Sequence, residues 1–190
     1  LVTYGKTLGG GYPVGVVCGP HHLMKRYRDD RPADICFARG TFNSHPHVMA
    51  AMNEFLKLLD TPEIEEIYRN ADAVWTARAD RLNERLRTEG LPVRVANMQS
   101  IWTVTYTVPS RYNWMLQYYL RAEGLALSWV GTGRFIFSLN YGAAEFDAVC
   151  ERFVAAAKKR EADGWWWTPP GASNKTIRRR ILREMLTRKR

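Results

Sequence analysis

Residues 5–15 read Gly5-Lys6-Thr7-Leu8-Gly9-Gly10-Gly11-Tyr12-Pro13-Val14-Gly15. Apolar, β-rich segments flank this stretch at residues 1–4 and 14–18, so we expect two strands joined by a tight turn. The consecutive glycines permit positive φ angles and let a ligand approach the backbone closely. A lysine in a partly buried turn of this kind loses hydration, and a dehydrated amine is a better nucleophile. Lys6 is therefore the first candidate for covalent chemistry.

Two other interpretations of this turn compete with the covalent one. Lys6 could be a surface lysine beside a structural turn, because short motifs often occur by chance. Gly5-Lys6-Thr7 also matches the end of a Walker A phosphate-binding loop, which requires a helix that starts at the lysine. Gly9-Gly10-Gly11 and Pro13 would break such a helix at once, so the sequence disfavours a phosphate loop.

A second segment reads Gly40-Thr41-Phe42-Asn43-Ser44-His45-Pro46, and Met49-Ala50-Ala51 follows shortly after. Pro46 suits the first position of a helix, because the N–H that proline lacks would be unpaired there in any case. We expect a helix from Pro46 to residue 59 and another from residue 62 to a stop at Gly90. The predicted buried stripe of the second helix consists of Ile64, Ile67, Tyr68, Ala71, Val74, Trp75, Leu82 and Leu86.

The rest of the chain mixes strands and helices. We expect a short helix at residues 21–27, two strands within residues 93–108, a helix at 112–123 and a strand at 134–139. An amphipathic helix is expected at 145–163, with five residues facing inward: Phe146, Val149, Cys150, Phe153 and Val154. This mixture predicts a compact α+β domain over residues 62–165. A Trp- and Pro-rich segment follows, and residues 174–190 are expected to form a basic helix.

Charge and cysteine content narrow the function classes. Residues 175–190 hold eight basic residues and one acid, so only +2 of the net charge of +9 belongs to the rest of the chain. The basicity therefore belongs to a tail and not to the fold. No apolar run is long enough to span a membrane. Cys18, Cys36 and Cys150 have no paired spacing, which favours a reduced, cytoplasmic environment over disulfides or a zinc site.

Together, the two quoted segments closely resemble the class III pyridoxal-phosphate-dependent aminotransferases (fold type I), a family that includes glutamate-1-semialdehyde 2,1-aminomutases. The first segment resembles the active-site lysine motif, and the second resembles the Gly-Thr-Phe-Ser-Gly-Asn-Pro segment, in the family's order and spacing. The resemblance is close over residues 1–60, looser over 61–165 and absent over 166–190. It implies an α/β fold in which residues 1–61 end the cofactor-binding large domain, with its mostly parallel sheet. Residues 62–165 would form the small α+β domain, and 166–190 a Trp/Pro-rich segment and basic helical tail.

The resemblance also implies an activity. Lys6 would form a Schiff base with pyridoxal 5'-phosphate, and the enzyme would transfer an amino group between an amine or amino acid and a carbonyl substrate. Gly40 and Thr41 would bind the cofactor phosphate of a partner subunit, which implies a homodimer with shared active sites. Arg134 stands roughly where many members place an arginine that binds a substrate carboxylate. Its neighbours depart from the common pattern, so a surface or ion-paired arginine is the alternative.

The sequence departs from the family at two places. Ser44-His45 replaces the family's Gly-Asn pair, and His45 with His47 lacks a third ligand, so we expect a structural role and no metal site. The family's acidic partner of the pyridine nitrogen, its ring stack and its own-chain phosphate loop lie upstream of Lys6. We therefore expect this chain to be a fragment of a longer enzyme and to be inactive when isolated.

Two alternatives to an aminotransferase remain open. One is an aminomutase, which moves the amino group within one molecule by means of the same residues. The other is a non-catalytic fragment with a basic partner-binding tail. We expect no membrane partner, and the sequence disfavours nucleic acid because no recognition module accompanies the basic tail.

Overall fold

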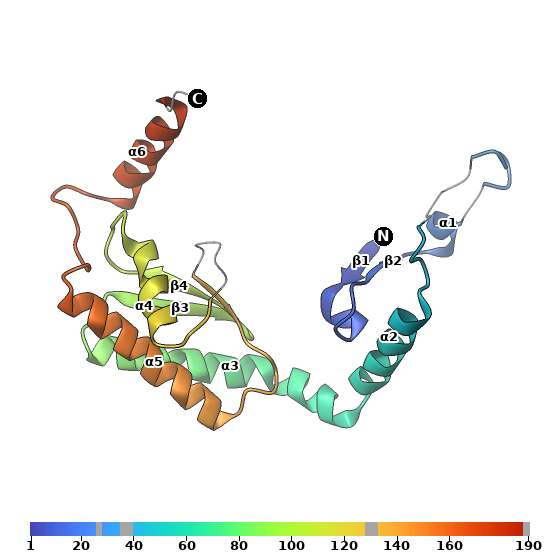
Figure 1. The fold of residues 1–190 in the computed structure, drawn as a ribbon, viewed down its shortest axis with the longest axis horizontal. Helices are drawn as coiled ribbons and strands as arrows, with labels where there is room; N and C mark the ends of the chain where they lie inside the picture. The colour runs from blue at the N-terminus through green and yellow to red at the C-terminus, as the bar shows by residue number, and fades with distance from the viewer. Residues whose placement is uncertain (26–27, 35–39, 128–132, 188–190) are drawn as a thin grey trace. The chain divides into compact units, whose positions relative to one another are not determined.

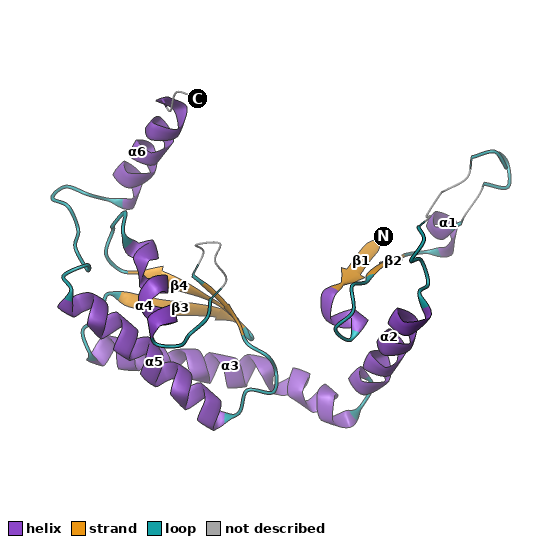
Figure 2. Ribbon diagram, viewed as in Figure 1, coloured by secondary structure: helices purple, strands orange, loops and turns teal. Residues whose placement is uncertain are grey.

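The computed structural model describes residues 1–25, 28–34, 40–127 and 133–187. The chain divides into two compact units, Leu1–Ile67 and Tyr68–Arg190, which are coloured blue to teal and green to red (Figure 1). Helices dominate both units, and each unit contains one small antiparallel sheet (Figure 2). This mixed α/β architecture confirms the predicted fold class.

The first unit is built around a hairpin and one long helix. β1 pairs antiparallel with β2, from Val2 opposite Cys18 to Gly5 opposite Gly15, which confirms the predicted strands. The predicted helix at 21–27 forms only over its first residues; Arg26 and Tyr27 lie outside the described part. The elements are β1 (Val2–Gly5), the 3-10 helix η1 (Lys6–Gly9), β2 (Gly15–Cys18), α1 (His21–Met24) and α2 (Pro46–Leu59).

This unit has almost no core of its own. Pro46 opens α2 as predicted, but no residue of α2 is buried. Among the described residues of the unit, only Gly9 is buried. Apolar side chains of the hairpin, such as Val2 and Val17, are about half exposed, at 51% and 53%. No parallel pair occurs among the described strands, so the mostly parallel sheet stays an expectation about residues outside them.

The second unit packs helices against a three-stranded antiparallel sheet of order β3-β4-β5. The predicted strands and helices between residues 93 and 163 are confirmed. β5 is shorter than the predicted 134–139, although the Phe137 N–H still donates to the Ser100 carbonyl at 3.0 Å. α3 (Pro62–Thr88) begins in the first unit and continues into the second from Tyr68. The other elements of the second unit are β3 (Val93–Met98), β4 (Ile101–Tyr106), η2 (Asn113–Met115), α4 (Leu116–Ala122), β5 (Arg134–Ile136), α5 (Ala143–Ala162) and α6 (Asn174–Thr187).

Helix α3 ends as the sequence predicts but buries a different stripe. Gly90 adopts φ 71°, and the Leu91 N–H donates to the Leu86 carbonyl at 2.9 Å, a glycine-based helix stop. The predicted stripe is wrong at three positions, which are exposed, and it omits the buried Ala79. Ile67 and Tyr68 stand four and three residues before Ala71, where periodicity predicts burial, yet both are exposed; Val74 lies off the buried face. The buried stripe is Ala71, Trp75, Ala79, Leu82 and Leu86.

An aromatic cluster fills the core of the second unit. Trp102 of β4 contacts Phe137 with ring centroids 5.1 Å apart and Phe146 of α5 at 5.5 Å, both edge to face. Trp75 of α3 stacks on Phe137 at 5.2 Å. Such pairs add to the free energy gained by burying the rings. All five residues predicted to face inward from α5 are buried, which confirms that helix and its orientation.

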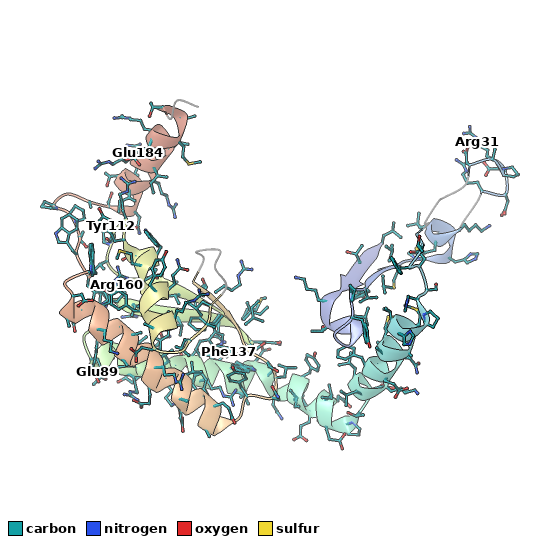
Figure 3. The ribbon with its side chains drawn as sticks, in the orientation of Figure 1. Arg31, Glu89, Tyr112, Phe137, Arg160 and Glu184 are labelled. Carbon is teal, nitrogen blue, oxygen red and sulfur yellow. The ribbon has the colours of Figure 1, made fainter. Side chains whose placement is uncertain are left out.

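Arg160 of α5 is buried in the same unit, with 0% of its surface exposed. Its guanidinium donates to the carbonyls of Tyr112 at 2.8 Å, Asn113 at 3.0 Å and Trp165 at 3.1 Å (Figure 3). It also lies 3.8 Å from the centroid of the Trp166 ring, a cation–π contact. Burial lowers the pKa of Arg160. These contacts hold Trp165 and Trp166, at the start of the Trp-rich segment, against the rest of the second unit.

Candidate active site

The turn that carries Lys6 is shaped by glycine. η1 follows β1 directly, and the turn continues through Gly10 and Gly11, whose φ angles are 58° and 97°. The Gly10 N–H donates to the Thr7 carbonyl at 2.9 Å, which closes the turn. L-residues rarely adopt these φ angles, so the sequence correctly predicts that glycine is needed here.

Lys6 itself has a left-handed backbone, with φ 57°. This conformation costs a non-glycine residue about 1–2 kcal/mol, and such strain concentrates at functional sites. The side chain is exposed, so the expectation of a partly buried lysine is wrong in this chain; the buried residue of the turn is Gly9. Within the described ranges, the Lys6 side chain forms no ion pair and no hydrogen bond, so its amine is available for reaction.

The segment that contains Thr41 forms two successive turns before α2. The Asn43 N–H donates to the Gly40 carbonyl at 3.0 Å, and the His45 N–H donates to the Phe42 carbonyl at 3.2 Å. Thr41 is exposed, as is Gly40. Backbone N–H groups near a helix start suit an anion, so the position is chemically compatible with a phosphate.

The two segments meet where the Lys6 turn packs on α2. A Cβ built on Gly10 would lie 3.2 Å from the Ala51 carbonyl oxygen and 3.4 Å from the Ala51 Cβ. Only a residue without a side chain allows this approach without a shift of the backbone. Glycine at position 10 is therefore required for packing against α2 as well as for the turn.

A cavity of about 540 Å³ lies between the hairpin and the second segment. Residues 12–15 line one side, and residues 42–45 with Val48 and Met49 line the other. Neither Lys6 nor Thr41 is among the lining residues. The structure thus brings the two motifs together but does not place the two predicted site residues in one pocket. Every lining residue except Val48 belongs to one of the two motif segments, yet nothing in the sequence distinguishes these residues as cavity walls.

His45 lies at this cavity and at the start of α2. Its ring centroid is 6.2 Å from that of Phe42 and 5.3 Å from that of His47. The His45 Nδ1 atom is buried and has no hydrogen-bond partner among the described residues. In the part of the chain that the structure describes, no three His, Cys, Asp or Glu side chains form a group that could hold a metal ion. The structural role of His45 and His47 stays a prediction.

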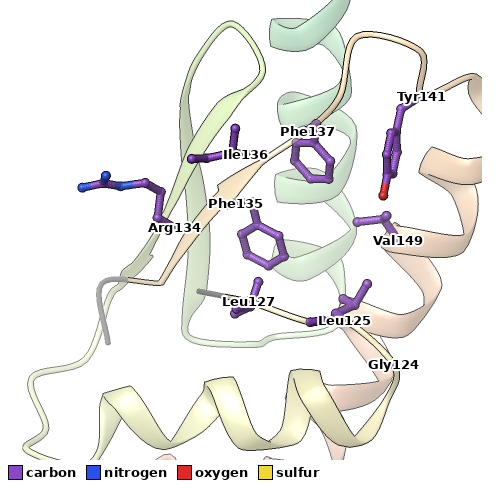
Figure 4. Close-up of a pocket in the computed structure, with 10 residues that line it drawn as sticks. Gly124, Leu125, Leu127, Arg134, Phe135, Ile136, Phe137, Tyr141 and Val149 are labelled. Atoms are coloured by element: carbon purple, nitrogen blue, oxygen red, sulfur yellow. The ribbon is translucent and has the colours of Figure 1, made fainter. Parts of the chain in front are cut away.

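Arg134 belongs to the second unit, on the edge strand β5. Burial alternates along the strand: Phe135 and Phe137 are buried, whereas Arg134 and Ile136 are exposed. Arg134 lines a cavity of about 530 Å³ together with Phe135, Phe137 and Tyr141. Figure 4 shows the Arg134 guanidinium extending away from the aromatic rings. Its predicted contact with a substrate carboxylate stays a prediction.

Known proteins are similar to this chain over part of its length. Glutamate-1-semialdehyde 2,1-aminomutases from Anaeromyxobacter dehalogenans and Methanococcus maripaludis are 35% identical over 107 residues and 32% over 106 residues, respectively. Each match covers 56% of this chain and 23% of the relative. No protein-family model matches the chain.

Solved structures agree with the sequence relatives. An omega-transaminase from Sphaerobacter thermophilus has a TM-score of 0.66 and 25% identity, covering 82% of this chain and 37% of that one. A transaminase with PLP bound has a TM-score of 0.67 and covers 85% of this chain and 38% of that one; at 22% identity it shows the fold alone. The chain spans well under half the length of these proteins. The chain is thus similar in sequence to part of glutamate-1-semialdehyde 2,1-aminomutases and similar in fold to the C-terminal part of pyridoxal-phosphate-dependent transaminases, which confirms the predicted resemblance.

Proposed function

We propose that the protein to which this chain belongs is a pyridoxal-phosphate-dependent aminotransferase that acts through Lys6. The observation that carries the proposal is the state of Lys6 itself. It is a strained, unpaired lysine in a glycine-rich turn, in a chain similar to enzymes that move amino groups. The substrates are a small-molecule amino donor and a carbonyl acceptor.

The residues present fit the cofactor. The glycines beyond Lys6 leave the outside of the turn free of side chains, and an added Cβ on Gly11 would meet nothing within 4 Å. Pyridoxal phosphate, when bound, supplies an aldehyde carbon that bonds to amines and a ring that takes up an electron pair. The aldehyde needs an amine that is not already engaged in an ion pair, and Lys6 provides one among the described residues.

Lys6 would have two successive tasks. Its Nζ atom would hold the cofactor until the amine of the substrate replaces it. The released Nζ would then act as the base that accepts the proton from the substrate Cα and as the acid that returns it.

Gly40 and Thr41 would bind the cofactor phosphate from a second subunit. The exposed Thr41 hydroxyl and the nearby start of α2 support this role. We therefore propose a homodimer with shared active sites. The exposed apolar side chains of the first unit are consistent with further burial in an assembly. We also propose a cytoplasmic location, in keeping with the free thiols of Cys18 and Cys150; Cys36 lies outside the described residues.

An aminomutase is the second candidate, because the sequence relatives carry that name. The two activities use the same lysine and differ in whether the intermediate amine leaves the site. Product analysis with glutamate-1-semialdehyde alone separates them: an aminomutase gives 5-aminolevulinate without a second substrate, and an aminotransferase requires an amino donor.

Substitution of Lys6 tests the proposal. In the protein expressed from its complete coding sequence, Lys6→Ala should abolish the visible absorbance of bound cofactor and lower turnover by at least about a hundredfold. Lys57→Ala is the matched control, since Lys57 is an exposed lysine of α2 paired with Glu54. If Lys6→Ala keeps both absorbance and turnover, the assignment is wrong; if the unaltered protein shows neither, the non-catalytic alternative holds.

A further inference from the structure

Helix α6 carries large apolar side chains that the described fold leaves in water. Ile181, Leu182, Met185 and Leu186 are 39%, 57%, 70% and 78% exposed. With about 3.6 residues per turn, Ile177, Ile181 and Met185 form one stripe, and Leu182 and Leu186 extend the apolar surface to about half of the helix circumference, with Arg178 between them. No residue of α6 is buried. The described residues cover this apolar surface only in part, at Ile177 and Ile181, and they leave Leu182, Met185 and Leu186 mostly exposed.

The same helix is strongly basic. Five basic residues accompany a single acid within it: Lys175, Arg178, Arg179, Arg180 and Arg183 against Glu184. Arg111 donates two hydrogen bonds to the Glu184 carboxylate, at 2.6 Å and 2.9 Å. Arg180 donates a third, at 3.2 Å (Figure 3 labels Glu184). The only acid of the helix is thus occupied. Within the described ranges, Arg178, Arg179 and Arg183 form no ion pair, so the positive charge of these side chains is available to an external anion.

Charge and exposed apolar surface together select the type of partner. Nucleic acid would use the arginines but leave Leu182 and Leu186 in water. A second copy of the chain would bring an equally basic helix to the same face, which like charges oppose. The surface of an anionic bilayer accommodates both features, because acyl chains accept the apolar face and lipid phosphates accept the arginines.

We propose that α6 binds the surface of an anionic phospholipid bilayer and lies in the plane of the interface. No helix in the described ranges is long and apolar enough to cross a membrane. A surface position does not require that length. The proposal replaces the sequence expectation of no membrane partner, which rested on the lack of a spanning segment. It is independent of Lys6 and of the proposed transferase activity.

Vesicle flotation of the protein expressed from its complete coding sequence tests this inference. The chain should float with vesicles of phosphatidylcholine and phosphatidylglycerol and should remain at the bottom with phosphatidylcholine alone. Added salt should weaken the binding, because it screens the arginines. Equal binding to both vesicle types, or binding to neither, would overturn the proposal.

Paired variants separate the two contributions. Arg179→Gln with Arg183→Gln should lower the binding constant about twenty-five-fold, since each basic residue near such a surface contributes about a fivefold increase in affinity. Leu182→Ser with Leu186→Ser should lower it by at least about tenfold. Leu56→Ser with Leu58→Ser, at exposed leucines of α2, is the matched control and should bind normally.

The leucine pair also distinguishes lipid from other anionic partners. If Leu182→Ser with Leu186→Ser binds vesicles as well as the unaltered chain does, charge alone drives binding and the interfacial position is wrong. Retention on duplex DNA that survives this variant, without flotation of the unaltered chain, would assign α6 to nucleic acid instead. Flotation that requires both the leucines and the arginines supports the proposal.

Discussion

A Cβ placed on Gly10 would lie only 3.2 Å from the carbonyl oxygen of Ala51. This contact fixes the turn that carries Lys6 against α2, and α2 follows the segment that carries Thr41. The two motifs that resemble those of the aminotransferases are therefore connected by backbone packing, independently of any ligand.

Gly10→Ala should loosen the first unit. Its φ of 58° costs an alanine about 1–2 kcal/mol, and the new methyl group meets the Ala51 backbone. Hydrogen exchange of the Gly10 and Tyr12 amides should become about tenfold faster, with exchange in the second unit unchanged. Gly15→Ala is the control, since a Cβ there meets nothing within 4 Å. Equal exchange in the two variants would show that the contact is unimportant.

Arg160→Met should destabilise the second unit by about 3 kcal/mol. The change leaves three carbonyls, at residues 112, 113 and 165, without the guanidinium that they accept from. Urea unfolding followed by tryptophan fluorescence measures the loss, and Trp166 should become more accessible to quenchers. Arg152→Met is the control, because Arg152 is exposed and makes one longer bond, at 3.3 Å, to the Glu123 carbonyl. A loss no larger than that of the control would contradict the account.

Tyr106 should make stability fall at high pH. Burial raises the pKa of Tyr106 from 10.0 to about 12, and the charge of Arg160 opposes this only in part. Between these values the unfolded chain has lost the phenol proton while the folded protein retains it, so the free energy of unfolding decreases as pH rises. The full effect is about 3 kcal/mol. Tyr106→Phe should remove this part of the pH dependence; identical profiles for both proteins would refute the assignment.

Local backbone chemistry made much of the first unit predictable. Glycines at positions 9–11 permit φ angles that other residues rarely adopt, and proline at position 46 fixes its own φ, so a turn and a helix start follow from sequence alone. The exposure of Lys6 was not predictable, because burial depends on what surrounds the turn. The contact of Gly10 with Ala51 joins residues far apart in sequence, so no local pattern reveals it.

Arg160 shows the same limit in the second unit. Periodicity puts position 160 on the buried stripe of α5 with Phe153 and Ala157, whereas its residue type suggests the surface. The carbonyls that allow its burial come from the turn before α4 and from Trp165. Only the tertiary fold brings them together, so sequence reasoning did not single out this residue.

The central claim is that Lys6 is the lysine that bonds to pyridoxal phosphate. Borohydride reduction fixes such a bond as a stable secondary amine, and peptide mass mapping then identifies the labelled lysine. In the protein expressed from its complete coding sequence, we expect the label on the peptide that contains Lys6 and none on the peptide that contains Lys57. A label on another lysine, or no label in a protein that has visibly bound the cofactor, would contradict the assignment.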